Sequence, residues 1–217
     1  MKAALFVNGE FEKNSRLMKQ INQSDLIVAV DGGLRHVMAT GVTPHVIIGD
    51  LDSIDYADLD YFDRGGTDII KFPVQKDETD LELAVEHVLN LGFDEVIILG
   101  ATGGRIDHFF GNFLLFSNPE YQKCRISLLT KNSEVFYCKP YQQVEGAAGD
   151  KVSLIPISEK VSGIKTTGLM YPLQNEDLLR WKSRGISNQM LDRSALIEFE
   201  SGVLLCVHTF DSKPESV

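Results

Sequence analysis

The chain has 217 residues, of which 43% are hydrophobic, and a formal net charge of −10 at pH 7. This length allows one large domain or two small ones, and the apolar content is ample for a packed core, which excludes a disordered chain. The acidic balance opposes the counterion release that drives nucleic-acid binding, and no Lys/Arg-rich segment offsets it. A nucleic-acid partner is therefore not expected.

The sequence carries no signal for membrane insertion, secretion or disulfide formation. It has no run of about eighteen apolar residues, and the N-terminal stretch MKAALFVNGE lacks the charged and long apolar regions of a secretory signal. Cys124, Cys138 and Cys206 are far apart and have no CxxC spacing, so they predict neither a disulfide framework nor a zinc site. We therefore expect a cytoplasmic protein with no membrane partner.

The first 130 residues repeat one pattern: an apolar strand, a turn with Gly or Asp, and an amphipathic helix. This alternation predicts an α/β domain with an open, mostly parallel sheet and flanking helices, whose ligands bind beyond the carboxyl ends of the strands. The expected strands are 3–7, 26–30, 46–48, 68–72, 95–99 and 125–129. The expected helices are 15–22, 34–39, 56–64, 80–91 and 106–116.

From residue 131 onward the pattern changes. Short β-rich segments, separated by Gly, Pro, Asn or Asp, predict a C-terminal antiparallel β-sandwich domain over residues 131–217. The single tryptophan, Trp181, is expected to be a half-buried structural aromatic. The expected strands are 134–138, 152–156, 163–167, 195–199 and 203–207.

The stretch VIIGDLDS, residues 46–53, gives the clearest functional signal. Its β-branched start predicts a strand buried on both faces, which places Asp50 and Asp52 at the carboxyl end of that strand. Residues two apart on an extended backbone point the same way, and two carboxylates aimed at one place repel unless a cation lies between them. A divalent ion such as Mg²⁺ favours carboxylates together with substrate phosphates. The alternative for a lone DxD is a solvated acidic turn.

Two other strand ends carry candidate ligands. DGG, residues 31–33, follows the second strand, and its glycines allow a sharp turn and a close approach to a ligand. A helix-capping aspartate would explain the same motif. QKDETD, residues 75–80, follows the fourth strand. Thr79 and Glu82 form a capping box there, which puts Asp80 in the first turn of a helix.

The fifth strand runs into GATGGRIDH, residues 100–108. A glycine-rich loop before a helix offers amide N–H groups that can surround a phosphate, although the motifs GxxxxGK[ST] and GxGxxG are absent. Lys76 is either a surface ion pair or a phosphate ligand, and Arg105 suits a phosphate or a carboxylate. Asp107 either holds Arg105 in place or joins the acids around the metal. His108 is interpreted as a partly buried structural histidine.

In this order and at these spacings, GDLDS, KDETD and GGRIDH resemble the thiamin pyrophosphokinase family. The resemblance extends to Asp31-Gly32-Gly33 of the family's ADGG motif and to TTGLMY (166–171) and GISN (185–188), so it spans nearly the whole chain. It implies an enzyme that transfers a pyrophosphoryl group from ATP to the hydroxyl of thiamin, giving thiamin diphosphate and AMP. It also implies a homodimer, with thiamin between the α/β domain of one subunit and the β domain of the other.

Carried onto this sequence, the resemblance assigns three groups of site residues. The Mg²⁺ ligands would be Asp50, Asp52 and Asp80. The nucleotide and phosphate contacts would be Asp31, Gly32, Gly33, Lys76, Asp77, Thr79, Gly103, Gly104, Arg105 and Asp107. Thiamin would be bound by Tyr171, Ser187 and Asn188. Many family members have Trp at the position of Tyr171, so stacking on the cationic thiamin is expected to be weaker here.

The expected reaction depends on positioning and charge neutralisation more than on covalent help from the protein. Lys76 and Arg105 would steady developing charge, and either Asp80 or Asp107 would take the proton of the attacking hydroxyl. The expected catalytic set is Asp50, Asp52, Asp80, Arg105 and Asp107. Two other functions stay open: a DxD-type metal-dependent nucleotide-sugar transferase, and a non-catalytic nucleotide-binding module. The acids of KDETD and GGRIDH exceed what a sugar-transfer site requires.

Overall fold

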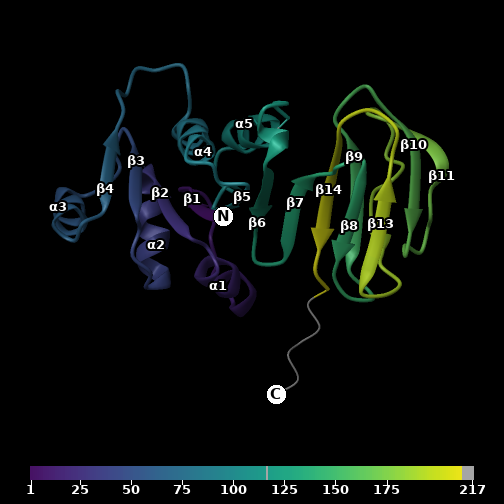
Figure 1. Ribbon diagram of the computed structural model, residues 1–217, viewed down its shortest axis with the longest axis horizontal. Helices are drawn as coiled ribbons and strands as arrows, with labels where there is room; N and C mark the ends of the chain where they lie inside the picture. Colours follow the sequence, from purple (N-terminus) through teal and green to yellow (C-terminus); the bar gives the residue numbers. More distant parts are fainter. Residues whose placement is uncertain (116, 212–217) are drawn as a thin grey trace. The chain divides into compact units, whose positions relative to one another are not determined.

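The computed structural model describes residues 1–115 and 117–211 (Figure 1). The chain divides into two compact units, Met1–Lys131 and a second one that begins at Asn132. The predicted fold class, an open α/β sheet followed by an antiparallel β unit, is confirmed. The end of the helix expected at 106–116 lies outside the described residues. No helix within the described ranges is long and apolar enough to cross a bilayer.

The first unit is built on parallel strands in the order β6-β5-β1-β2-β3-β4. Their bounds are β1 (Lys2–Phe6), β2 (Leu26–Val30), β3 (Val46–Gly49), β4 (Asp68–Lys71), β5 (Glu95–Leu99) and β6 (Arg125–Leu129). All six lie where the sequence predicts them, within one residue at each end. The prediction succeeds because these strands are short apolar runs, and in β3 all four residues are buried. Burying one isoleucine of this kind stabilises the fold by roughly 1.5–3 kcal/mol.

Two of the helices begin where a polar side chain satisfies a free N–H group of the first turn. Asn14 accepts from the N–H of Leu17 at 2.8 Å, and Thr79 accepts from that of Glu82 at 3.2 Å, so the predicted cap at Thr79 is confirmed. The helices are α1 (Ser15–Asn22), α2 (Leu34–Thr40), α3 (Tyr56–Arg64), α4 (Asp80–Asn90) and α5 (Ile106–Leu115), with short 3₁₀ turns at Asp31–Gly33 and Tyr121–Lys123.

The strand order creates a crevice beside β1. The chain moves outward from β1 through β2 and β3 to β4, then returns to β5 on the other side of β1. Because such crossovers are right-handed, the helices before and after this reversal cover opposite faces of the sheet. Figure 1 shows α4 and α5 on one side and α1 and α2 on the other. The loops that follow β1 and β5 therefore diverge, and ligands bind at switch points of this kind.

The second unit contains two antiparallel arrays of strands, ordered β12-β9-β14-β7 and β11-β10-β13-β8. Their inner faces share one buried apolar cluster, to which Leu154 and Cys206 of the first array and Val161 and Ile197 of the second contribute. The strands are β7 (Ser133–Tyr137), β8 (Tyr141–Glu145), β9 (Lys151–Pro156), β10 (Lys160–Thr167), β11 (Gln174–Leu179), β12 (Asn188–Gln189), β13 (Ser194–Glu198) and β14 (Leu204–Thr209).

The sequence missed three strands of this unit and misplaced its tryptophan. Strands β8, β11 and β12 lie at the edges of their arrays, where one side of the backbone and much of the side-chain surface face water. Polar residues are tolerated at such positions, so the apolar alternation used for prediction is weak there. The prediction for Trp181 was wrong: it lies in the turn after β11 and is 61% exposed.

Candidate active site

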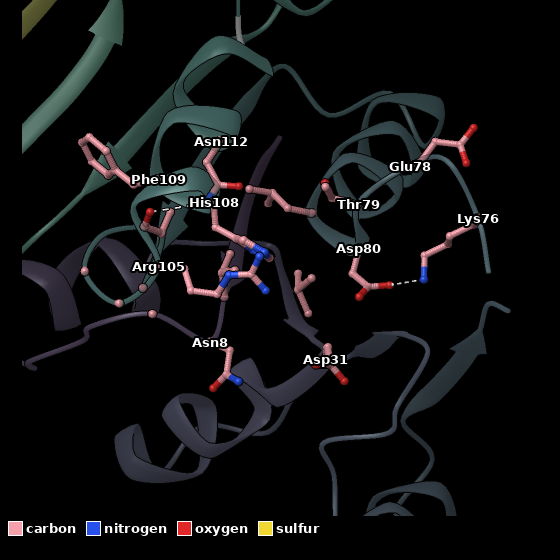
Figure 2. Close-up of a pocket in the computed structure, with 18 of the residues that line it drawn as sticks. Asn8, Asp31, Lys76, Glu78, Thr79, Asp80, Arg105, His108, Phe109 and Asn112 are labelled. Carbon is pink, nitrogen blue, oxygen red and sulfur yellow. Dashed lines mark hydrogen bonds and ion pairs between the residues drawn. The ribbon is translucent and has the colours of Figure 1, made fainter. Parts of the chain in front are cut away.

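A cleft of about 420 Å³ lies at the crevice between the loops that follow β1 and β5 (Figure 2). The end of β2, the start of α4 and the first turns of α5 complete its walls. Seven of the predicted site residues line it: Asp31, Lys76, Thr79, Asp80, Gly103, Gly104 and Arg105. Asp77 is exposed and is not among the lining residues.

Three carboxylates meet where β2 and β3 end. One oxygen of each of Asp31, Asp50 and Asp52 lies within 4.8 Å of the others. The sequence predicted an extended backbone between Asp50 and Asp52, and this prediction was wrong. The chain reverses direction at Leu51, which has a φ of +66°. The charge of Asp50 is the largest cause of the raised pKa of Asp52, followed by burial and by the charges of Asp31 and then Asp80. The site is thus a cluster of mutually repelling acids.

Asp31 is held in an unusual position. Its φ of +46° lies in the left-handed region, within the short 3₁₀ turn that follows β2. Oδ2 accepts a hydrogen bond from the hydroxyl of Ser53 at 2.6 Å. Oδ1 is buried and has no hydrogen-bond partner among the described residues. The helix-capping alternative is wrong, because no side chain caps this turn or the following α2.

Lys76 lies between two of the acids. Its ammonium nitrogen is 2.9 Å from Oδ1 of Asp80 and 3.8 Å from Oδ2 of Asp50, and it also donates to the carbonyl of Pro73 at 3.0 Å. Only 12% of the lysine side chain is exposed, which excludes the solvent-exposed surface pair that the sequence left open. Lys76 therefore links Asp80, at the start of α4, to Asp50 of the acid cluster.

Arg105 and Asp107 form a two-bond pair at the edge of the cleft. The guanidinium donates to Asp107 through Nη2 at 2.6 Å and through Nε at 3.2 Å. This pairing lowers the pKa of Asp107 to about 2 and raises that of Arg105. Of the two roles that the sequence left open for Asp107, the geometry favours holding Arg105. His108 is exposed and lines the cleft, so its interpretation as a partly buried residue was wrong.

The glycines of the DGG motif, expected to allow close approach to a ligand, lie close to other parts of the protein chain. A Cβ added to Gly33 would lie 1.9 Å from the carbonyl oxygen of Phe6, so the residue is glycine because the turn passes directly over the end of β1. The loop after β1 was missed by the sequence analysis, although it lines the cleft through Asn8 and Gly9. The signal that could have found it is its place after the first strand, beside the reversal of strand order.

A smaller pocket of about 200 Å³ in the second unit contains two of the three predicted thiamin residues. Tyr171 is 62% exposed there. Asn188 is buried, and its side chain accepts from the backbone N–H of Tyr171 at 3.0 Å and donates to the carbonyl of Tyr171 at 2.7 Å. Ser187 has a φ of +58° and lies next to the pocket. The remaining lining residues are Leu173, Ser183, Arg184, Gly185 and Ile186.

The acid cluster fits a hard divalent cation. Its donors are carboxylate oxygens, which Mg²⁺ prefers, and Asp31 also has a buried oxygen, Oδ1, that no described residue satisfies. The ammonium of Lys76 between Asp50 and Asp80 shows that positive charge is favourable at this place. A cleft at the switch point of a doubly wound sheet, with acids and two cationic side chains on its walls, is typical of the class of nucleotide-binding enzymes.

Comparisons with known proteins identify the family. Residues 17–128 match the model of the thiamin pyrophosphokinase catalytic domain, and residues 137–204 match that of the vitamin B1 binding domain. The chain is 29% identical over 192 residues to a thiamine pyrophosphokinase of Bacillus subtilis, covering 88% of this chain and 90% of the relative. A crystal structure of the Bacillus subtilis thiamine pyrophosphokinase has a TM-score of 0.85 at 25% identity, covering 97% of this chain and 100% of that one. The Geobacillus thermodenitrificans thiamin pyrophosphokinase gives 0.83 at 27% identity, covering 98% and 99%.

The chain belongs to the thiamin pyrophosphokinase family. It is an enzyme that transfers a pyrophosphoryl group from ATP to thiamin, as the resemblance of its motifs predicts. Neither the nucleotide-sugar transferase nor the non-catalytic module is favoured, because the match covers both the catalytic and the vitamin-binding parts of the family.

Proposed function

We propose that this transfer is Mg²⁺-dependent and that the metal ligands are Asp50, Asp52 and Asp80, together with Asp31. The observation that carries the proposal is the approach of three carboxylate oxygens to within 4.8 Å of one another, one of them from Asp31, which lines the cleft. When bound, the ion supplies neutralisation of the polyphosphate charge. Lys76 then leaves its ion pair with Asp80 and contacts a phosphate instead. The cation replaces the lysine beside Asp80, and the phosphate replaces the aspartate beside Lys76, so each charged group keeps a partner of opposite charge.

The residues of the chain position the reacting groups. Arg105 and the backbone N–H groups of Gly103 and Gly104 hold the phosphates from the side of α5, and Lys76 holds them from the side of α4. The hydroxyl oxygen of thiamin forms a bond to the β-phosphorus, and the bond between that phosphorus and the oxygen of the leaving AMP breaks in line. The walls of the cleft thus supply positive charge to the oxygens that gain negative charge.

Asp107 is the weaker of the two candidates for the proton acceptor. A carboxylate with a pKa of about 2, held by two hydrogen bonds to a guanidinium, is a poor base at neutral pH. We therefore assign Asp107 to the positioning of Arg105. Asp80, which lines the cleft, remains the candidate base.

The thiamin site is assigned to the pocket of the second unit. The exposed ring of Tyr171 is available to stack on the cationic thiazolium, and Asn188 holds the backbone of Tyr171 through both ends of its amide. Ser187 contributes a hydroxyl beside the pocket. On this assignment Tyr171 sets thiamin affinity directly, whereas Asn188 acts by fixing the loop that carries it.

The proposal includes a homodimer and keeps the predicted cytoplasmic location. What supports a second copy is the surface of α5, where Ile106, Phe110 and Leu114 repeat every four residues and are 72%, 55% and 58% exposed. An apolar stripe of this kind is typical of an interface. Sedimentation of the purified chain should give twice the monomer mass of 24.2 kDa.

The activity assay tests the proposal most simply. Purified chain with thiamin, ATP and Mg²⁺ should release AMP and thiamin diphosphate in equal amounts, and excess EDTA should abolish both. Release of ADP would contradict the transfer, and full turnover in EDTA would contradict the metal dependence.

A further inference from the structure

Ser53 lies beside the acid cluster and has no part in the chemistry described above. Its hydroxyl donates to Oδ2 of Asp31 at 2.6 Å, which is the short distance of a hydrogen bond to a charged acceptor. The other oxygen of the same carboxylate, Oδ1, is buried without a hydrogen-bond partner among the described residues. One oxygen of Asp31 is therefore fixed by the protein, and the other is left for a ligand.

The backbone has a rare conformation at the acceptor of this hydrogen bond, Asp31, and at Leu51, two residues before the donor Ser53. Asp31 and Leu51 both have positive φ values, +46° and +66°. A non-glycine residue keeps such a conformation only where the surroundings enforce it, and such residues gather at functional sites. The reversal at Leu51 directs the chain after β3 back toward the end of β2, so that Ser53 reaches a residue 22 positions earlier in the sequence.

Two glycines make room for the contact. A Cβ on Gly32 would lie 2.8 Å from Oγ of Ser53, and a Cβ on Gly49 would lie 3.0 Å from Cβ of Asp31. A side chain at either position would push the serine or the aspartate away. Gly32 and Gly49 therefore leave space for the serine and the aspartate. A Cβ on Gly32 would also meet Nδ2 of Asn8 at 2.5 Å, and the φ of +149° at Gly49 favours glycine by itself.

We propose that Ser53 is a positioning residue for the metal-dependent reaction. By holding Oδ2 of Asp31, its hydroxyl fixes the rotation of the carboxylate and leaves Oδ1 free for a cation that Asp31, Asp50 and Asp52 would hold. The inference rests on the proposed Mg²⁺ site. It differs from that proposal because Ser53 itself does not touch the ion.

The test compares Ser53→Ala with Ser53→Thr, which keeps the hydroxyl, in the full chain. Ser24→Ala is the matched control, because Ser24 also makes one side-chain hydrogen bond in the first unit, to the carbonyl of Gln20, away from the cleft. Free Mn²⁺, measured by electron paramagnetic resonance during titration of the chain with the metal alone, gives the affinity. Loss of an outer partner of a metal ligand typically costs 10–100-fold, so Ser53→Ala should bind about tenfold more weakly and Ser53→Thr within about threefold of the unchanged chain.

A second readout separates positioning from a merely structural role. The Mg²⁺ concentration for half-maximal rate should rise in Ser53→Ala, with the KM for thiamin unchanged. A lower melting temperature with unchanged Mn²⁺ affinity and unchanged Mg²⁺ requirement would overturn the inference. Asp52→Asn distinguishes this failure from failure of the metal site. If Asp52→Asn loses Mn²⁺ binding and Ser53→Ala does not, only the role of Ser53 is wrong; if Asp52→Asn binds Mn²⁺ normally, the proposed site is wrong as well.

Discussion

Asp150 and Asp31 are carboxylates in different units of this chain, and the protein treats them in opposite ways. Asp150 is 3% exposed, accepts hydrogen bonds from the backbone N–H groups of Ala147 and Asp211, and lies 2.9 Å from Nε2 of His208. Within the described ranges, Asp31 has one oxygen without a hydrogen-bond partner, and its neighbours include two other acids. A satisfied carboxylate stabilises the fold, whereas crowded carboxylates destabilise it and are therefore candidates for binding a ligand.

The pKa shifts in the two regions have opposite directions. Burial disfavours the charged form of Asp150, but the hydrogen bonds from Asp211, Ala147 and His208 outweigh it and lower the pKa. At Asp52 the charge of Asp50 and partial loss of solvent both raise the pKa. The difference shows that a carboxylate's partners, more than its depth in the protein, indicate whether its role is structural or functional.

The largest expected effect is that of Asp52→Asn on turnover. Removing one carboxylate from the cluster should lower kcat by about 10³-fold, the upper range for loss of a group that stabilises transition-state charge. Its melting temperature should stay nearly unchanged, because the variant also removes repulsion. Asp63→Asn, which alters an exposed acid on α3, is the control. Substantial activity in a folded Asp52→Asn chain would show that the acid pair is structural.

Asp150→Asn should show the reverse behaviour. Weakening hydrogen bonds to a buried charge should lower the free energy of unfolding by about 2 kcal/mol, while turnover per folded molecule stays close to that of the unchanged chain. Because the pKa of Asp150 is lowered in the folded state, its stabilisation is present above the ordinary value of 3.8 and is lost as pH falls below it. Denaturant unfolding between pH 3 and 7 should therefore show the two chains converging at the acidic end. A constant difference across this range would contradict the account.

A smaller effect is expected for Asp107→Asn. If Asp107 only holds Arg105, the variant should raise the KM for ATP several-fold, because the guanidinium loses the partner that orients it. Steady-state kinetics at saturating ATP should then recover most of kcat. A loss of kcat that ATP does not restore would return Asp107 to the role of proton acceptor.

The smallest effect concerns thiamin binding. Tyr171→Trp should lower the KM for thiamin by about threefold, because indole is the better face for a cation and the gain at an exposed site is about 0.5–1 kcal/mol. Tyr171→Phe serves as the control that keeps a single six-membered ring. An unchanged KM in the tryptophan variant would argue that the cation does not stack on this side chain.

The sequence predicted the first unit almost completely, and the reason is physical. Strands β2, β5 and β6 and helix α1 have the predicted bounds, because buried apolar runs and capped amphipathic helices leave a clear local pattern. Edge strands such as β11 (Gln174–Leu179) carry polar residues and leave no such pattern. Trp181 was misplaced for a related reason, since an exposed turn sets no requirement on the side chain it carries.

The candidate site was predicted less completely than the fold. Sequence reasoning found Asp50 and Asp52 from their position after a strand, and the family resemblance assigned Asp80 as the third ligand, whereas the third carboxylate that the structure groups with this pair belongs to Asp31. The hydrogen bond from Ser53 to Asp31 joins the ends of two neighbouring strands. No periodicity or spacing within one segment reveals a contact of this kind, because it depends on the left-handed turn at Leu51.

The central claim, that the crowded acids bind a divalent cation and the satisfied ones do not, is tested most directly by thermal unfolding with and without Mg²⁺. A ligand that binds only the folded state stabilises it by an amount that grows with the ratio of its concentration to its Kd. The account predicts that Mg²⁺ raises the melting temperature of the unchanged chain and of Asp150→Asn by the same amount, and leaves that of Asp52→Asn where it was. An equal rise in all three chains, or no rise in any of them, would contradict it.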